Sequence, residues 1–109
     1  MTGDATAAPV PGAADGAPAY RWLGHGTVFL PGPPRLLVDP WRRQGAGPRA
    51  DAVLVTQDAI DHCAPDDVAA ALAPAAPVLA PGRAAALLRP ELGERVRTVA
   101  PGDRVVVGD

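Results

Sequence analysis

Polar side chains that can bind metal or move protons crowd into one short stretch, VLVTQDAIDHCAPDD at residues 53–67. An apolar run ends at Thr56, and Asp58, Asp61 and His62 follow within six positions. Such residues are typical of sites at the carboxyl ends of strands, because the loops there converge on a crevice. The stretch therefore predicts a metal or acid/base site, or else a loop in which the aspartates cap and the histidine packs.

Two more residues of the same chemical kind precede this stretch. His25 and Asp39 lie in, or at the end of, segments that read as strands. If the sheet brings these strand ends together, five polar groups share one crevice.

The stretch also holds two residues that weaken the metal hypothesis. A catalytic zinc takes about four ligands, three of them from protein. Gln57 is a poor zinc ligand and Ala59 is none. A zinc held only by Asp61 and His62 would be weak unless other groups or another chain contributed.

The elements that must position these residues follow from composition and turn signals. Residues 1–19 are Ala, Gly, Pro and small polar residues and predict a disordered tail, with one domain over 20–109. Gly24 and Gly26 predict a bulge or a close backbone approach inside the first strand, and Pro90 predicts a break in the second helix. We expect strands at 20–30, 35–39, 52–56, 77–80, 95–99 and 104–108, and helices at 65–73 and 83–92.

This order predicts an α/β (α+β) domain, a mixed sheet with two helices on one face. The net charge of −2 is close to neutral, and no basic stripe suggests binding to nucleic acid. No apolar run approaches the ~18 residues that span a membrane. The single cysteine, Cys63, excludes an intrachain disulfide and fits a reducing, cytoplasmic setting.

Four motifs together resemble the metallo-β-lactamase fold hydrolases, especially the branch of ascorbate-phosphate lactonases. Residues 22–27, Trp-Leu-Gly-His-Gly-Thr, are similar to that branch's Trp-Leu-Gly-His-Ala-Thr opening. Residues 37–40, Leu-Val-Asp-Pro, resemble its second strand, which ends in Thr-Asp-Pro. Residues 52–62 align with the strand and signature His-x-His-x-Asp-His, and residues 99–103 with a later hairpin.

The resemblance implies half of an αββα sandwich and a site for one or two zinc ions. Asp61 and His62 match the aspartate and histidine of the second metal, and we assign Asp61 the catalytic role. Gln57 and Ala59 stand where the first-metal histidines should be, so the motif is half lost.

The resemblance also places the remaining polar residues near the site. His25, Asp39 and Asp58 are expected as outer-shell or substrate-side groups. The family's later metal ligands have no counterpart before Asp109, so we expect only the first half of the fold.

Two functions remain open from these observations. The first is a non-hydrolytic member, whether pseudoenzyme, binding module or gene remnant, in which zinc is bound weakly or not at all. The second is a zinc-dependent hydrolase of ester, lactone or phosphodiester bonds whose site is completed by a second chain. In either case we expect an apolar sheet face to be covered by self-association or by another polypeptide, because a large exposed apolar patch usually marks a partner surface.

Overall fold

The structure is a computed structural model, and it describes residues 19–42, 47 and 49–108. The predicted tail over 1–19 lies outside the described residues except for Ala19. Among the described helices, none combines the length and the apolar composition needed to cross a membrane.

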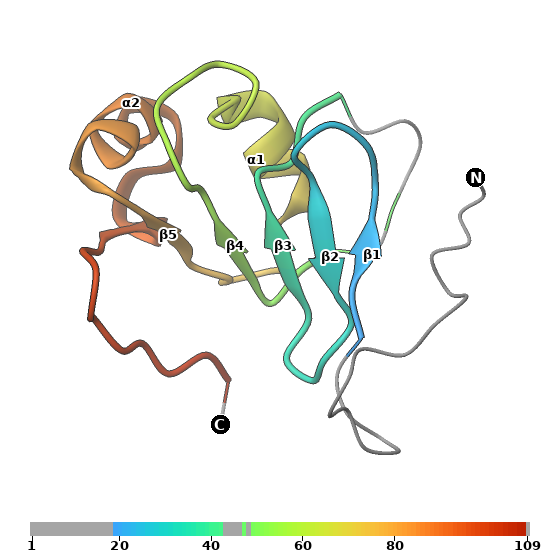
Figure 1. Ribbon diagram of the computed structural model, residues 1–109. Helices are drawn as coiled ribbons and strands as arrows, with labels where there is room; N and C mark the ends of the chain where they lie inside the picture. The colour runs from blue at the N-terminus through green and yellow to red at the C-terminus, as the bar shows by residue number, and fades with distance from the viewer. Residues whose placement is uncertain (1–18, 43–46, 48, 109) are drawn as a thin grey trace.

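The described strands form one mixed sheet in which spatial order follows chain order (Figure 1). Neighbours pair antiparallel from the first strand to the third and parallel from the third to the sixth. The strands are β1 (Arg21–Trp22), β2 (Val28–Leu30), β3 (Leu36–Val38), β4 (Ala52–Leu54), β5 (Val78–Ala80) and β6 (Val96–Thr98).

Two helices connect the parallel strands. α1 (Pro65–Ala71) joins β4 to β5, and α2 (Gly82–Leu92), followed by the 3-10 turn η2 (Gly93–Arg95), joins β5 to β6. Crossovers between parallel strands are almost always right-handed, so two successive ones in the same direction place both helices on one face. The helices contact each other and lie together behind the sheet in Figure 1. This arrangement confirms the predicted fold class.

The hydrophobic core lies between the helices and one face of the sheet. Register aligns one core residue from each of five strands in a row: Phe29, Leu37, Val53, Val78 and Val96. Each is no more than 5% exposed. The helices cover this row with small and branched apolar side chains, including Val68, Ala71, Ala84, Ala85 and Leu88.

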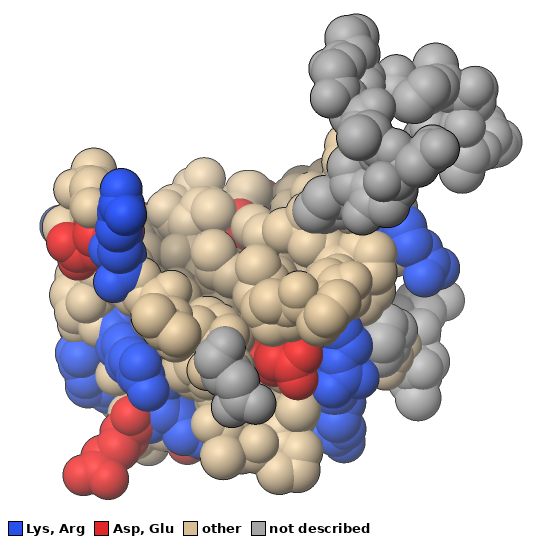
Figure 2. Space-filling view, turned by 90° about the horizontal axis from the view of Figure 1, so that it is seen from below, with Lys and Arg blue, Asp and Glu red and all other residues tan. Residues whose placement is uncertain are grey.

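The opposite face of the sheet is apolar but less covered. Val28, Val38 and Leu54 share a register row on this face and are half-buried. Figure 2 looks from below at the lower edge of the sheet and not at this face, and it shows uncharged surface between charged groups on either side.

The prediction of one long strand over residues 20–30 was wrong. The segment is a hairpin, because Gly24 (φ 101°) and His25 (φ 52°) both adopt left-handed backbone that a continuous strand does not allow. Leu23 N donates to Thr27 O at 2.9 Å and Thr27 N donates to Gly24 O at 3.0 Å, which closes the turn.

Two further expectations about the carboxyl-terminal part were also wrong. α2 continues through Pro90 to Leu92. Proline removes only the bond to the carbonyl of Ala86, which is exposed and can be hydrated. Residues 104–108 form no strand, because the turn at Gly102 leads them away from β6 and a strand needs a hydrogen-bonded neighbour (Figure 1).

Candidate metal centre

Three strand ends meet at one edge of the sheet. Because β1 and β3 are both antiparallel to β2, and β4 is parallel to β3, the carboxyl ends of β1, β3 and β4 share this edge. The β1–β2 turn carries His25, the end of β3 carries Asp39, and the β4–α1 loop carries Asp61 and His62. Figure 1 shows these three segments side by side at the top of the sheet. Topology alone therefore gathers residues that are far apart in sequence.

Asp39 is the buried centre of this edge. Its side chain is 3% exposed. One carboxylate oxygen, Oδ1, accepts from the Thr56 backbone N at 2.7 Å, and Oδ2 accepts from Thr56 Oγ1 at 2.5 Å. Its backbone O accepts from the buried Thr27 hydroxyl at 2.7 Å, and its N donates to Leu54 O at 2.9 Å. These bonds hold Asp39 at φ 47°, a left-handed conformation that Asp tolerates better than most residues.

His62 is oriented by this carboxylate. Its Nδ1 lies 2.7 Å from Asp39 Oδ2. An ionised carboxylate only accepts, so Nδ1 carries the hydrogen and Nε2 presents its lone pair to the opposite side. A carboxylate behind an imidazole in this way is the usual support of a metal-binding histidine. The side chain as a whole is 22% exposed.

His25 and Asp61 face each other across the same edge. His25 Nε2 lies 2.7 Å from Asp61 Oδ2, and that oxygen is also 3.8 Å from His62 Nε2. The hydrogen bond from His25 lowers the pKa of the Asp61 carboxyl below its ordinary value, against the opposing effect of desolvation. Asp61 is therefore ionised at neutral pH, and its carboxylate oxygens can act as ligands for a cation.

Two tryptophans surround His25. Trp22 Nε1 donates to the His25 backbone O at 2.7 Å, and the Trp41 ring centroid lies 4.6 Å from that of His25. The guanidinium of Arg42 stacks on the outer face of Trp41, 4.4 Å from its centroid. Although 64% exposed, Trp22 thus fixes the backbone of the turn that presents the His25 imidazole.

The ligand trio, His25, Asp61 and His62, fits a cation site. Its donor atoms all lie within 4.8 Å of one another. Two imidazole nitrogens and one carboxylate oxygen are a ligand set that zinc accepts. At bond lengths of roughly 2.0–2.1 Å, tetrahedral ligands stand about 3.3 Å apart, so the two distances to Asp61 Oδ2, 2.7 and 3.8 Å, lie close to that spacing.

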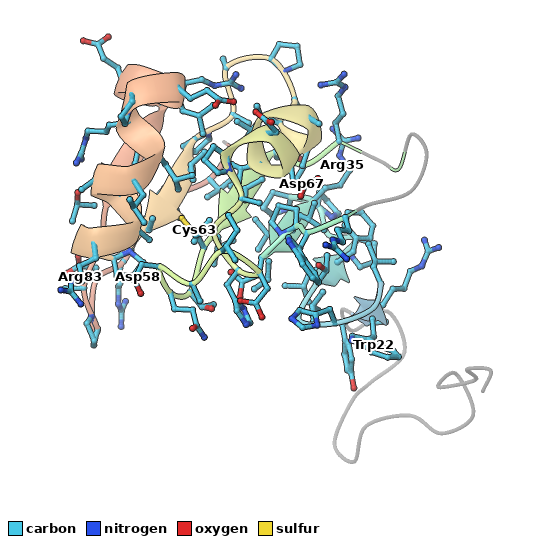
Figure 3. The ribbon with its side chains drawn as sticks, turned by 90° about the horizontal axis from the view of Figure 1, so that it is seen from above. Trp22, Arg35, Asp58, Cys63, Asp67 and Arg83 are labelled. Carbon is cyan, nitrogen blue, oxygen red and sulfur yellow. The ribbon has the colours of Figure 1, made fainter. Side chains whose placement is uncertain are left out.

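The structure places the other predicted site residues differently. Gln57 and Ala59 are exposed in the β4–α1 loop. Asp58 lies near Arg83 of α2, at 4.0 Å, and Figure 3 shows this pair well apart from Trp22. Cys63 is buried against α2, and burial raises the pKa of its thiol.

Sequence reasoning missed one grouping. His25 was expected in the outer shell without a named partner, and the structure brings its Nε2 within hydrogen-bond distance of Asp61 Oδ2. The signal that could have indicated this is the Gly-His-Gly spacing, because two flanking glycines are typical of a tight turn that presents its middle side chain.

Comparisons with known proteins give the family and the fold. Residues 20–109 match the family described as "Beta-lactamase superfamily domain". A crystal structure from Parabacteroides distasonis ATCC 8503, named "Putative metal-dependent hydrolase", superposes with a TM-score of 0.66 at 21% sequence identity. That match covers 84% of this chain and 42% of the other, so the chain spans less than half the length of its structural relative. No curated protein matches significantly.

Proposed function

Because the chain belongs to the β-lactamase superfamily, we propose that it is a non-hydrolytic member that holds one divalent cation, zinc in the first instance, at the second-metal position. The proposal rests on one observation. Asp61 and His62 are preassembled, with His62 Nδ1 bound to Asp39 and His62 Nε2 free to accept a cation. The first-metal position, in contrast, has only Gln57 and Ala59 in place of histidines.

Two residues would bind the cation, and two others position them. Asp61 and His62 would hold the cation, and Asp39 would fix the ring of His62. Thr56 in turn fixes both oxygens of Asp39. When bound, such a cation supplies Lewis acidity that could polarise a carbonyl or phosphoryl oxygen. With a single incomplete site, we expect binding but no turnover.

The second candidate function is a hydrolase of ester, lactone or phosphodiester bonds completed by another polypeptide. One observation favours it: the apolar face of the sheet opposite the helices carries Val28, Val38 and Leu54, all half-buried. A second layer on this face would bury these residues and could carry further ligands to the same edge of the sheet. Static light scattering tests this, since a monomer that binds no hydrophobic dye contradicts the proposed partner.

Elemental analysis of the purified protein tests the main proposal. We expect close to one equivalent of zinc per chain after dialysis against micromolar zinc, and loss of that metal in Asp61→Asn and His62→Gln. Asp58→Asn is the matched control, because Asp58 lies in the same loop but pairs with Arg83. A wild-type protein free of metal, or hydrolysis of ester, lactone or phosphodiester substrates by the chain alone, would overturn the proposal.

A restoration experiment tests the lost half of the site. Gln57→His combined with Ala59→His returns two imidazoles to exposed loop positions, where they disturb no packing. We expect the zinc content to rise from one toward two equivalents. An unchanged content would mean that these loop positions do not correspond to a first-metal site.

A further inference from the structure

We propose that His25 is the third protein ligand of the cation site, and that Gly26 makes this arrangement possible. The inference rests on the proposed function and extends it, because the superfamily signature at residues 57–62 does not include the β1–β2 turn. In this chain the cation would lie toward that turn, and not toward Gln57 and Ala59, the first-metal positions of the β4–α1 loop.

The His25 ring lies beside both other proposed ligands. Its Nε2 lies 2.7 Å from Asp61 Oδ2, on the side of Asp61 that His62 Nε2 approaches at 3.8 Å. The two imidazole rings stand 5.8 Å apart between centroids and are tilted by 49°. A cation between the three donors would replace the hydrogen that His25 and Asp61 now share.

His25 is held in place by its neighbours and is not free to rotate away. Its φ of 52° fixes the turn, and its backbone O accepts the hydrogen bond from Trp22. The Trp41 ring lies 4.6 Å from the imidazole and limits its movement on one side. A ligand held by its neighbours loses less entropy on binding, which favours coordination.

Gly26 leaves space for the His62 ring. A Cβ at this position would lie 2.8 Å from His62 Cε1 and 3.2 Å from His62 Nδ1. The absence of a side chain therefore lets the His62 ring pack directly against the β1–β2 turn, which brings its Nε2 toward His25 and Asp61. Because the φ of Gly26 is not positive, alanine here would test this space without straining the backbone.

Zinc binding to matched variants tests the inference. His25→Gln keeps a hydrogen-bond donor for Asp61 and so preserves the turn, but removes the imidazole. We expect its zinc affinity to fall by more than about 100-fold, beyond the roughly 10–100-fold that an outer-shell change costs. Gly26→Ala should weaken binding as well, because it displaces His62, whereas Asp58→Asn should bind as the wild type does.

A direct spectroscopic readout distinguishes ligation from support. In nitrogen-15 NMR spectra, zinc should shift the Nε2 resonance of His25 together with that of His62 in the wild type. An unshifted His25 Nε2, or His25→Gln with wild-type affinity, overturns the inference but leaves the proposed function standing. A wild type that binds no zinc overturns both. Thermal melts of each variant show that any lost affinity occurs in folded protein.

Discussion

Asp39→Asn is the substitution whose consequence the structure defines most closely. Asparagine tolerates the φ of 47° at this position, so the backbone can stay in place. Its oxygen can keep the bond from Thr56 N at the Oδ1 position, because an NH₂ group there would face another donor. The NH₂ group must then occupy the Oδ2 position, where it meets Thr56 Oγ1 and His62 Nδ1.

The two partners respond differently to this exchange. The Thr56 hydroxyl can rotate and accept, since a hydroxyl is both donor and acceptor. His62 can accept at Nδ1 only by moving its hydrogen to Nε2, the atom that faces Asp61 at 3.8 Å. The substitution therefore blocks the proposed ligand atom without touching it.

The expected magnitude follows from the bonds that change. Loss of a supporting carboxylate costs roughly 10–100-fold in metal affinity, or about 1.4–2.7 kcal/mol. Replacing charge-assisted bonds by neutral ones at a side chain only 3% exposed should lower the free energy of unfolding by about 1–3 kcal/mol. The protein should remain folded but bind zinc more weakly.

Two measurements check this prediction. Calorimetric zinc titration gives the affinity, and nitrogen-15 NMR of the imidazoles reports which nitrogen of His62 carries the hydrogen. Asp58→Asn controls for the loss of one negative charge in the same region. Wild-type affinity combined with an unchanged His62 tautomer in Asp39→Asn would refute the reasoning, and the tautomer can be read without any metal.

Three further substitutions test the framework of the sheet. Leu37→Ala removes a fully buried side chain from the central row and should lower the free energy of unfolding by about 2–5 kcal/mol in urea denaturation; a cost below this range would place Leu37 outside the core. Gly93→Ala should cost about 1–3 kcal/mol, because φ 57° and ψ −131° suit only glycine, whereas Gly82→Ala, with open space and ordinary φ, should be neutral. Asp51→Asn should destabilise the protein at pH 7 more than at pH 3. The hydrogen bond from Arg35 lowers the pKa of Asp51 in the folded state, so the stabilisation by this pair is present above the pKa of Asp51 in the unfolded state and is lost as the pH falls through its pKa in the folded state. An Asp51→Asn protein whose deficit does not shrink in acid would contradict that link.

The parallel half of the fold could be predicted from the sequence, and the hairpin at its start could not. Continuous apolar runs such as 52–56 identify the central strands of the sheet, and Pro65 marks the start of the helix that follows. Aromatic and β-branched residues at 20–30 favour a continuous strand and outweighed the Gly-His-Gly spacing, whereas the backbone angles of Gly24 and His25 show the reversal. The turn with these angles makes one local contact, from Trp22 Nε1 to the His25 backbone O, and one distant contact, between the rings of His25 and Trp41.

The site shows the same division between local and long-range information. Asp61 and His62 could be identified from their spacing after a strand, because the loop that carries them is local. The partnership of His25 with Asp61 spans 36 positions and depends on β1 and β4 ending at the same edge. The pairing of Asp39 with His62 likewise depends on strand order, which a motif does not encode.

The sequential strand order has a consequence for how the domain opens. Each strand pairs with its chain neighbour, so the amino-terminal hairpin of β1 and β2 is attached to the rest of the sheet through β3 alone. The bond between His25 and Asp61 is a second attachment, joining the β1–β2 turn directly to the loop before α1. A cation bound there would link two segments that are far apart in the sequence and so close a long loop of chain. It would stabilise only the state in which the hairpin is docked on the β4–α1 loop. Amide hydrogens of the hairpin should therefore exchange more slowly with zinc present, while those of the β5–β6 side should change little.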